Sequence, residues 1–532
     1  MQATGPLRVR RSLTDIQADY ESGNKTELEN LWRAWKGIQE LPPDDPHSFF
    51  VIGGYHGEPF RGAGWGTSAY WGGYCNHGNV LFPTWHRAYL VRLEDALRSI
   101  PGCADVTLPF WDETSDASAA GGIPWALTVE NIELGGQTIP NPLRSFVLPK
   151  SIVDNLSPFP DADYSKPKGY ETVRYPLSGL VGPGDIDQTK AHNAMYPDYD
   201  QNVTTLNANI VNWMTAFAVV VNGKPIGMVR REYQECLDAP NYTVFSNTTS
   251  ATEWNGNADV LVKPLESPHN HIHLAVGGYE LPNQPDFSPI QGANGDMGEN
   301  DTAGLDPIFF FHHCHVDRMF WLWQQRHNST ETLEIIEGYP GTNSVDNQGP
   351  TPGVPPNSWL NIDSPLAPFL NTDGTAMTSR DCVNIETQLG YTYGPGSLDE
   401  LATPPAAAAA AGEAAAAGVG VVGGPKQVIS VRGINRTQIP GSFLVSAYVN
   451  VDGKRHHVGT ESVFSRWHVE GCMNCQTHLE AKAHFHVPQE VAGTVRPEQV
   501  EVELHRRKAP AGRPVLLTSE QSVAPGLRVQ VR

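Results

Sequence analysis

Three separate stretches of this 532-residue chain combine histidine with aromatic residues at spacings that suit metal binding. The histidines that these patterns single out are His56, His77, His86, His269, His273 and His313. His77 and His86 are nine residues apart, and His86 falls in an apolar helical pattern. His269 and His273 are four residues apart, so a helix projects both from one face. Side chains on facing helices can converge on a metal in the centre of a bundle.

The chemistry open to such a set depends on the metal. Neutral imidazole is the commonest metal ligand in proteins, and all-imidazole sets suit copper, zinc, iron or nickel. Zinc cannot exchange electrons with dioxygen, so oxidation chemistry requires one of the redox metals. A lone histidine such as His192, His327 or His468 is most often a surface or hydrogen-bonded core residue. Three patterns that each pair histidine with an aromatic helix favour a metal site instead.

The segments that must position these histidines show helical periodicity. Apolar residues recur at steps of three and four over 26–40, 84–99, 205–220 and 315–327, with Thr84 placed as an N-cap. Long stretches rich in Gly, Pro and Asn connect them and carry aromatic residues throughout. We therefore predict a mainly α catalytic domain over residues 1–400, a helical bundle with long loops.

The chain changes character after this region. Residues 401–426 are rich in Ala, Gly and Pro and predict a linker. Residues 427–532 then alternate apolar and polar positions over 428–432, 443–451 and 500–504, and Asp452-Gly453 is typical of a hairpin turn. We predict a small antiparallel β domain at the C-terminus.

Composition excludes several partners. A formal charge of −21 argues against nucleic acid and anionic membranes, which both need a basic surface. We find no apolar run long enough to span a membrane and no secretory signal, which predicts a cytoplasmic protein. Seven cysteines at irregular spacing do not form a disulfide framework. Sequons such as Asn24-Lys25-Thr26 leave secretion open, and homo-oligomerisation is also open.

Taken together, GYHG, Cys75-x-His77, FPTWHR, HNxxH and DPxFxxHHxxVDR resemble the copper-binding regions of tyrosinases and catechol oxidases, over roughly residues 50–330. These are type 3 copper proteins, to which the hemocyanins are related. The resemblance implies two copper ions per chain, dioxygen as co-substrate and small phenols as substrates. It assigns His56, His77 and His86 to the first copper. It assigns His269, His273 and His313 to the second, with His271, His312 and His315 as neighbours that do not bind metal.

The same resemblance suggests residues that tune the site. Cys75 matches a cysteine that forms a thioether with the second ligand, here His77; otherwise it is a small buried thiol. Glu266 and Asn270 match a pair that holds a water which deprotonates the incoming monophenol. A free phenol has a pKa near 10, so a base or the metal must supply the phenolate. The alternative is that Glu266 is a solvated acid and Asn270 a polar residue at the start of a helix. The positions expected to shape the substrate pocket are Leu274, Val276 and Met297.

The predicted C-terminal domain resembles the extension that shields the active site in fungal pro-tyrosinases. Phe464 is the candidate to plug the pocket, with Val463 and Trp467 as alternatives. Cys472-x-x-Cys475 resembles elements associated with copper loading, and a local disulfide is the alternative. Upstream, Tyr391-x-Tyr393 resembles the motif that closes the catalytic domain, and we expect N-terminal arginines to contact it.

The sequence thus predicts a tyrosinase that hydroxylates monophenols at the ortho position, oxidises o-diphenols to o-quinones, and is restrained by its C-terminal domain. A catechol oxidase or an o-aminophenol oxidase without the hydroxylation step is the nearest alternative. A hemocyanin-like oxygen carrier is a further one. Carriers usually string several such units in one chain, whereas a single unit with a tethered lid favours an enzyme.

Overall fold

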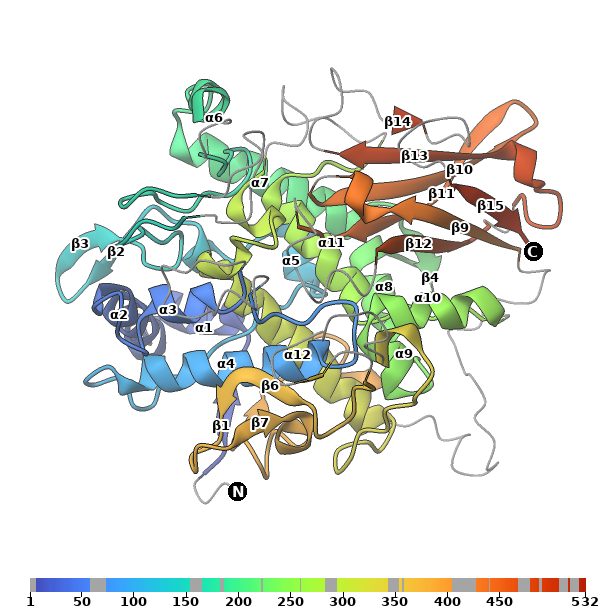
Figure 1. The fold of residues 1–532 in the computed structure, drawn as a ribbon. Helices are drawn as coiled ribbons and strands as arrows, with labels where there is room; N and C mark the ends of the chain where they lie inside the picture. The colour runs from blue at the N-terminus through green and yellow to red at the C-terminus, as the bar shows by residue number, and fades with distance from the viewer. Residues whose placement is uncertain are drawn as a thin grey trace.

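The computed structural model comprises a helical body and a layer of C-terminal strands that lies over part of it (Figure 1). It describes residues 6–57, 73–153, 165–181, 186–221, 223–258, 260–282, 294–342, 354–355, 358–403, 427–439, 441–466, 479–487, 490–506, 515–516 and 526–532. This arrangement confirms the predicted fold class, which is mainly α with small antiparallel sheets towards the C-terminus.

The helices of the body are short to medium in length and are joined by long loops. They are α1 (Leu13–Glu21), α2 (Thr26–Glu40), α3 (Phe49–Gly54), α4 (Phe82–Ser99), α5 (Asp116–Gly121), α6 (Ile186–Asn193), α7 (Tyr199–Thr215), α8 (Met228–Leu237), α9 (Tyr242–Ser246), α10 (Thr248–Asn257), α11 (Glu266–Gly277) and α12 (Ile308–Arg326). Small strands lie between them: β1 (Arg8–Arg10), β2 (Asn131–Leu134), β3 (Gln137–Pro140), β4 (Val219–Val221), β5 (Lys224–Ile226), β6 (Pro365–Leu370), β7 (Ala376–Thr378) and β8 (Tyr391–Tyr393).

The predicted helices are present, and several of their ends differ, including the start of α7, which lies at Tyr199 and not at 205. The prediction of Thr84 as an N-cap is wrong, because α4 begins at Phe82 with Pro83 in its first turn. Proline fits there since the first amides of a helix have no partner within it. The prediction for 205–220 runs too far, because α7 ends at Thr215 and residues 219–221 form β4. Helix α12 begins seven residues before the predicted start at 315, which places His313 inside it.

A buried charge cluster ties α4 to α12. The Asp317 carboxylate of α12 accepts hydrogen bonds from Arg87 Nε of α4 at 2.6 Å and from the hydroxyls of Tyr391 and Tyr393, both at 2.6 Å. The Arg10 guanidinium lies 3.6 Å from the centre of the Tyr391 ring, the predicted contact between the N-terminus and the tyrosine motif. Losing one member of such a buried set leaves an uncompensated charge, so the cluster fixes the relative position of the two helices.

The C-terminal strands form two antiparallel sheets with a core of their own. These strands are β9 (Val428–Asn435), β10 (Phe443–Val451), β11 (Lys454–Val463), β12 (Glu480–His486), β13 (Val500–Arg506), β14 (Val515–Leu516) and β15 (Arg528–Val531). The sheet order is β11-β10-β13-β14 in one and β12-β9-β15 in the other. The β10–β11 hairpin turns at Asp452-Gly453, both at positive φ, as the sequence predicts.

The two parts of the molecule bury separate sets of apolar side chains. The core between the C-terminal sheets draws only on residues 429–531. Of the described residues after 426, the core of the helical body takes just two buried side chains, Leu444 and Phe464. Parts with separate cores can in principle fold independently. Of the described helices, none pairs the length with the apolar composition that a bilayer crossing requires.

Candidate metal centre

The first three predicted histidines meet in the centre of the helical body. His56 follows α3, His77 lies in the loop before α4, and His86 is in the second turn of α4. Their ring centres are 5.2 to 5.6 Å apart, and their candidate ligand atoms all lie within 4.8 Å of one another. The sequence spreads these residues over thirty positions, and the packing of α3 against α4 brings them together.

The second group forms between α11 and α12. The Nε2 atom of His313 lies 3.2 Å from that of His269 and 3.3 Å from that of His273. The two groups are adjacent, because the rings of His86 and His313 stack with their centres 4.4 Å apart. Phe309, one turn before His313, stacks on its ring with the centres 4.0 Å apart.

Hydrogen bonds to the Nδ1 atoms fix which nitrogen of each ring faces inward. His56 Nδ1 donates to the Asn300 carbonyl at 3.2 Å, His86 Nδ1 to the Phe82 carbonyl at 2.8 Å, and His273 Nδ1 to the Met297 carbonyl at 2.9 Å. A carbonyl oxygen only accepts, so each Nδ1 carries the proton and each Nε2 keeps a free lone pair. The Nε2 atoms of His56 and His86 are buried and have no hydrogen-bond partner among the described residues. Such inward-facing lone pairs fit a bound cation.

Electrostatics keep these rings neutral. Burial lowers the pKa of His56, His269, His273 and His313 well below the ordinary value, and the neighbouring histidines lower it further. Burial likewise lowers the pKa of His86 to about 3. A metal ion requires the unprotonated ring, so the two groups are already in the ligating state at neutral pH.

His312 also lies in the second group, next to His313. Its ring centre is 5.2 Å from that of His269, and its Nε2 is buried without a hydrogen-bond partner in the part of the chain that the structure describes. Its Nδ1 is hydrogen-bonded to Glu113 at 2.6 Å, and burial raises the pKa of Glu113 to about 8. Sequence patterns did not single out Glu113, because nothing in its local sequence marks it as a partner of a residue two hundred positions away.

The turn that supports His273 depends on a close backbone approach. Residues 296–298 form a short 3-10 turn, and the Met297 carbonyl in this turn accepts a hydrogen bond from His273 Nδ1. A Cβ atom on Gly277, at the end of α11, would lie 2.2 Å from the Cα of Gly298. Only glycine permits this contact, which brings the turn within reach of the ring. The same loop holds His56 through the Asn300 carbonyl, so it orients one histidine of each group.

Glu266 and Asn270 line one cavity of about 90 Å³ together with His77. Glu266 opens α11, and its carboxylate accepts from the Gly78 amide at 2.8 Å and from the amide and hydroxyl of Thr248 at 2.8 and 2.9 Å. Burial raises its pKa, and these hydrogen bonds offset part of the rise. Asn270 pairs through Oδ1 with His269 Nδ1 at 3.0 Å. A polar cavity of this size has room for water.

The remaining predicted residues are buried around the two groups or fall outside the described residues. Leu274, Val276 and Met297 are fully buried. Cys75 is buried, and like the other described cysteines (Cys103, Cys236, Cys314 and Cys382) it forms no disulfide. Trp467, Cys472 and Cys475 lie outside the described residues.

Two side chains from the segment directly after β11 enter the helical body. The Phe464 ring is 6% exposed and stacks on His273, with centres 4.3 Å apart and planes at 25°. Arg466 donates to Asp301 at 2.6 Å and to the Cys75 sulfur at 3.2 Å. The sequence predicted a role for Phe464 but not for Arg466. The only local signal for Arg466 was a basic residue two positions after the predicted plug.

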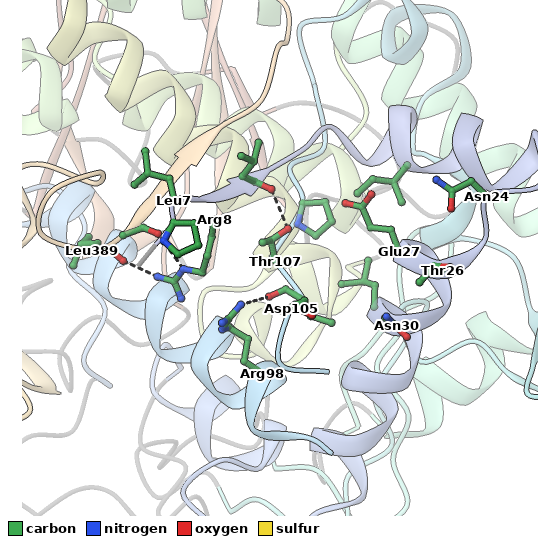
Figure 2. Close-up of a pocket in the computed structure, with 17 residues that line it drawn as sticks. Leu7, Arg8, Asn24, Thr26, Glu27, Asn30, Arg98, Asp105, Thr107 and Leu389 are labelled. Carbon is green, nitrogen blue, oxygen red and sulfur yellow. Dashed lines mark hydrogen bonds between the residues drawn. The ribbon is translucent and has the colours of Figure 1, made fainter. Parts of the chain in front are cut away.

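A second cavity, of about 860 Å³, lies between β1, α2 and the end of α4 (Figure 2). Two of its polar lining residues are hydrogen-bonded to other residues of the lining, since Arg8 donates to the Leu389 carbonyl at 2.6 Å and Thr107 to the Val9 carbonyl at 3.1 Å. None of the described residues that line this cavity is a histidine or a cysteine.

Comparison with known proteins agrees with this geometry. Residues 46–326 match the family model described as the common central domain of tyrosinase. The chain is 52% identical to a tyrosinase of Hahella sp. (strain CCB-MM4) over 91% of this chain and 89% of that protein. It is 43% identical to a tyrosinase of Aspergillus oryzae over 96% of both. A solved structure of tyrosinase from Burkholderia thailandensis superposes with a TM-score of 0.80 at 47% identity, covering 99% of each chain.

The chain therefore belongs to the tyrosinase family, a family of copper oxidoreductases. This confirms the family, the fold class and the enzyme class that the sequence predicted.

Proposed function

We propose that this chain is a tyrosinase that hydroxylates monophenols and oxidises o-diphenols, with one copper in each histidine group. The observation that carries the proposal is the convergence of neutral, inward-facing Nε2 atoms in two adjacent groups. We assign His56, His77 and His86 to the first copper and His269, His273 and His313 to the second. His312 is a neighbour whose ring is tethered to Glu113.

Two coppers would supply dioxygen binding and electron exchange, and the protein would supply position and proton transfer. Glu266 and Asn270 line the cavity beside His77, where a water held between them can take the phenol proton. The raised pKa of Glu266 suits this task, because a base whose pKa lies nearer neutrality both accepts and releases a proton readily.

We further propose that residues 427–532 form a lid, tethered by the linker 401–426, that keeps the enzyme latent. The Phe464 ring occupies the face of His273 where a phenol ring would stack.

Two further proposals concern cysteines. Cys75 forms a thioether with the His77 ring, and Cys472 with Cys475 takes part in copper loading. Peptide mass analysis of the copper-loaded protein tests the first, since the link removes two hydrogens.

The decisive experiment measures copper content and then oxygen uptake with tyrosine and with its catechol analogue. We expect about two coppers per chain, little uptake by intact protein and strong uptake on both substrates after cleavage in the linker. Uptake on the catechol alone would identify a catechol oxidase. Reversible oxygen binding without turnover after cleavage would identify a carrier. Copper near one per chain, or zinc in its place, would refute the proposal.

A further inference from the structure

The lid segment that covers the site runs along α11 and contacts it at three levels. Glu461 lies at the first turn of the helix, Ser462 at its middle, and Phe464 on His273 beyond. The Ser462 carbonyl accepts from Asn270 Nδ2 at 3.3 Å, and its hydroxyl is hydrogen-bonded to His271 Nδ1 at 2.6 Å. The segment therefore occupies the surface as an extended peptide does, through both its backbone and its side chains.

The contact farthest from the metal centre is a carboxylate site. The Glu461 carboxylate accepts from the Ser267 hydroxyl at 2.8 Å and from Lys263 Nζ at 3.1 Å. Lys263 also pairs with the buried Glu232 at 2.9 Å, and its side chain is only 19% exposed. Glu232 and Ser267 belong to the helical body, so a charged ammonium and a hydroxyl donor remain in place when the lid leaves.

We propose that Lys263 and Ser267 form a recognition site for a substrate carboxylate, and that the lid imitates a peptide substrate. The substrate class is then a tyrosine within an extended chain, preceded at three positions by Asp or Glu. Phe464 stands where that tyrosine ring binds and Glu461 where the acid binds. This inference rests on the proposed function of the metal centre.

The spacing separates such a peptide from free tyrosine. Three residues of extended chain span about 10 Å. The carboxylate of free tyrosine is attached within the same residue as the ring, so it does not reach Lys263 when the ring lies on His273. A peptide also supplies the backbone carbonyl that Asn270 Nδ2 binds in the closed form. The proposed site thus selects for the acid at one position of a chain rather than for negative charge in general.

The test compares two substrates on the full-length, copper-loaded protein. The peptides are acetyl-Glu-Ser-Val-Tyr-amide and acetyl-Gln-Ser-Val-Tyr-amide, and the measurement is kcat/KM for oxygen uptake. Both peptides require the open form, so the fraction of open enzyme cancels in their ratio. Hydrogen bonds to a charged partner predict roughly a tenfold to hundredfold preference for the Glu peptide. Moving the Glu to the position directly before Tyr should abolish the preference.

Variants then locate the preference on the protein. Lys263→Met should bring the ratio close to one, whereas Lys263→Arg keeps the charge and should retain most of it. Lys36→Met is the matched control, because Lys36 is an exposed lysine on α2 that pairs with Glu40. If Lys263→Met fails to fold, the ratio of kcat/KM between the Glu and Gln peptides on the wild-type protein still tests the carboxylate site.

The outcomes separate this inference from the proposed function. Equal kcat/KM for the two peptides, with a simple catechol oxidised normally, overturns the carboxylate site and leaves the oxidase intact. A preference that survives Lys263→Met overturns the assignment to Lys263. If neither the peptides nor the catechol are oxidised by copper-loaded protein cleaved in the linker, the proposed function itself fails.

Discussion

Arg466 offers a direct test of how the lid is held. Its guanidinium and the Asp301 carboxylate lie 2.6 Å apart, and both side chains are 1% exposed. Arg466→Met leaves Asp301 buried without its cation in the closed form, whereas opening returns that carboxylate to water. Removing one partner of a buried pair costs about 3 to 5 kcal/mol. A change of that size multiplies the open fraction by roughly a hundredfold or more, until the open form predominates.

The assay is oxygen uptake by intact, copper-loaded protein with a bulky diphenol, before and after cleavage in the linker. Arg466→Met should raise the activity before cleavage and leave the activity after cleavage unchanged. Arg455→Gln is the matched control, since Arg455 pairs with Glu501 and Glu503 within the C-terminal sheets and is 31% exposed. Activity before cleavage that stays within about twofold of wild type in Arg466→Met would refute the reasoning, because a carboxylate left buried without its cation costs far more than a twofold change in population.

Further predictions address the plug, the ligands and the buried acid. Phe464→Ala should raise the activity of intact protein on a small phenol, and Phe464→Leu should raise it less because part of the apolar contact remains; equal activity in both variants and wild type would contradict the plug. His56→Ala should lower bound copper by one ion per chain in metal analysis of folded protein, and unchanged copper content would remove His56 from the ligand set. Burial raises the pKa of Glu113 from 4.5 to about 8. Between those values the folded protein holds a proton on Glu113 that the unfolded chain has lost, so the contribution of Glu113 to the free energy of unfolding falls as pH rises, by at most about 1.4 kcal/mol per pH unit. In copper-free protein titrated with denaturant from pH 5 to 8, Glu113→Gln should remove this fall; parallel slopes for the two proteins would show that Glu113 folds ionised.

Local pattern determined much of the fold. The three- and four-residue apolar steps predicted the helix at 26–40, and alternation with Asp452-Gly453 predicted the β10–β11 hairpin. These signals are local, because helix and strand periods repeat within a few residues. Helix ends were less accurate, since packing and proline in the first turn move them, as Thr84 shows.

For the site, the sequence by itself determined which residues could bind a metal. Histidine type and spacing, together with the family resemblance, singled out six of the seven histidines that the structure brings into two adjacent groups, and His312 is the seventh. His312 and His313 are adjacent in the sequence, so local spacing does not predict which of their Nε2 atoms faces His269 and His273. That depends on the orientation of each ring. Only the tertiary structure gave the carbonyl partners at Asn300 and Met297, which orient His56 and His273 from a distant loop.

The lid contacts show the same division most clearly. The sequence predicted an aromatic plug in a C-terminal segment, but it did not predict the contacts that hold this segment on the helical body. The Arg466–Asp301 pair joins residues 165 positions apart, and the Glu461–Ser267 hydrogen bond joins residues 194 apart. Residue type and local spacing can indicate what a side chain is able to do. Which partner it meets is decided by how distant elements pack, because the energy of a buried charge or hydrogen bond depends on a neighbour that local sequence does not specify.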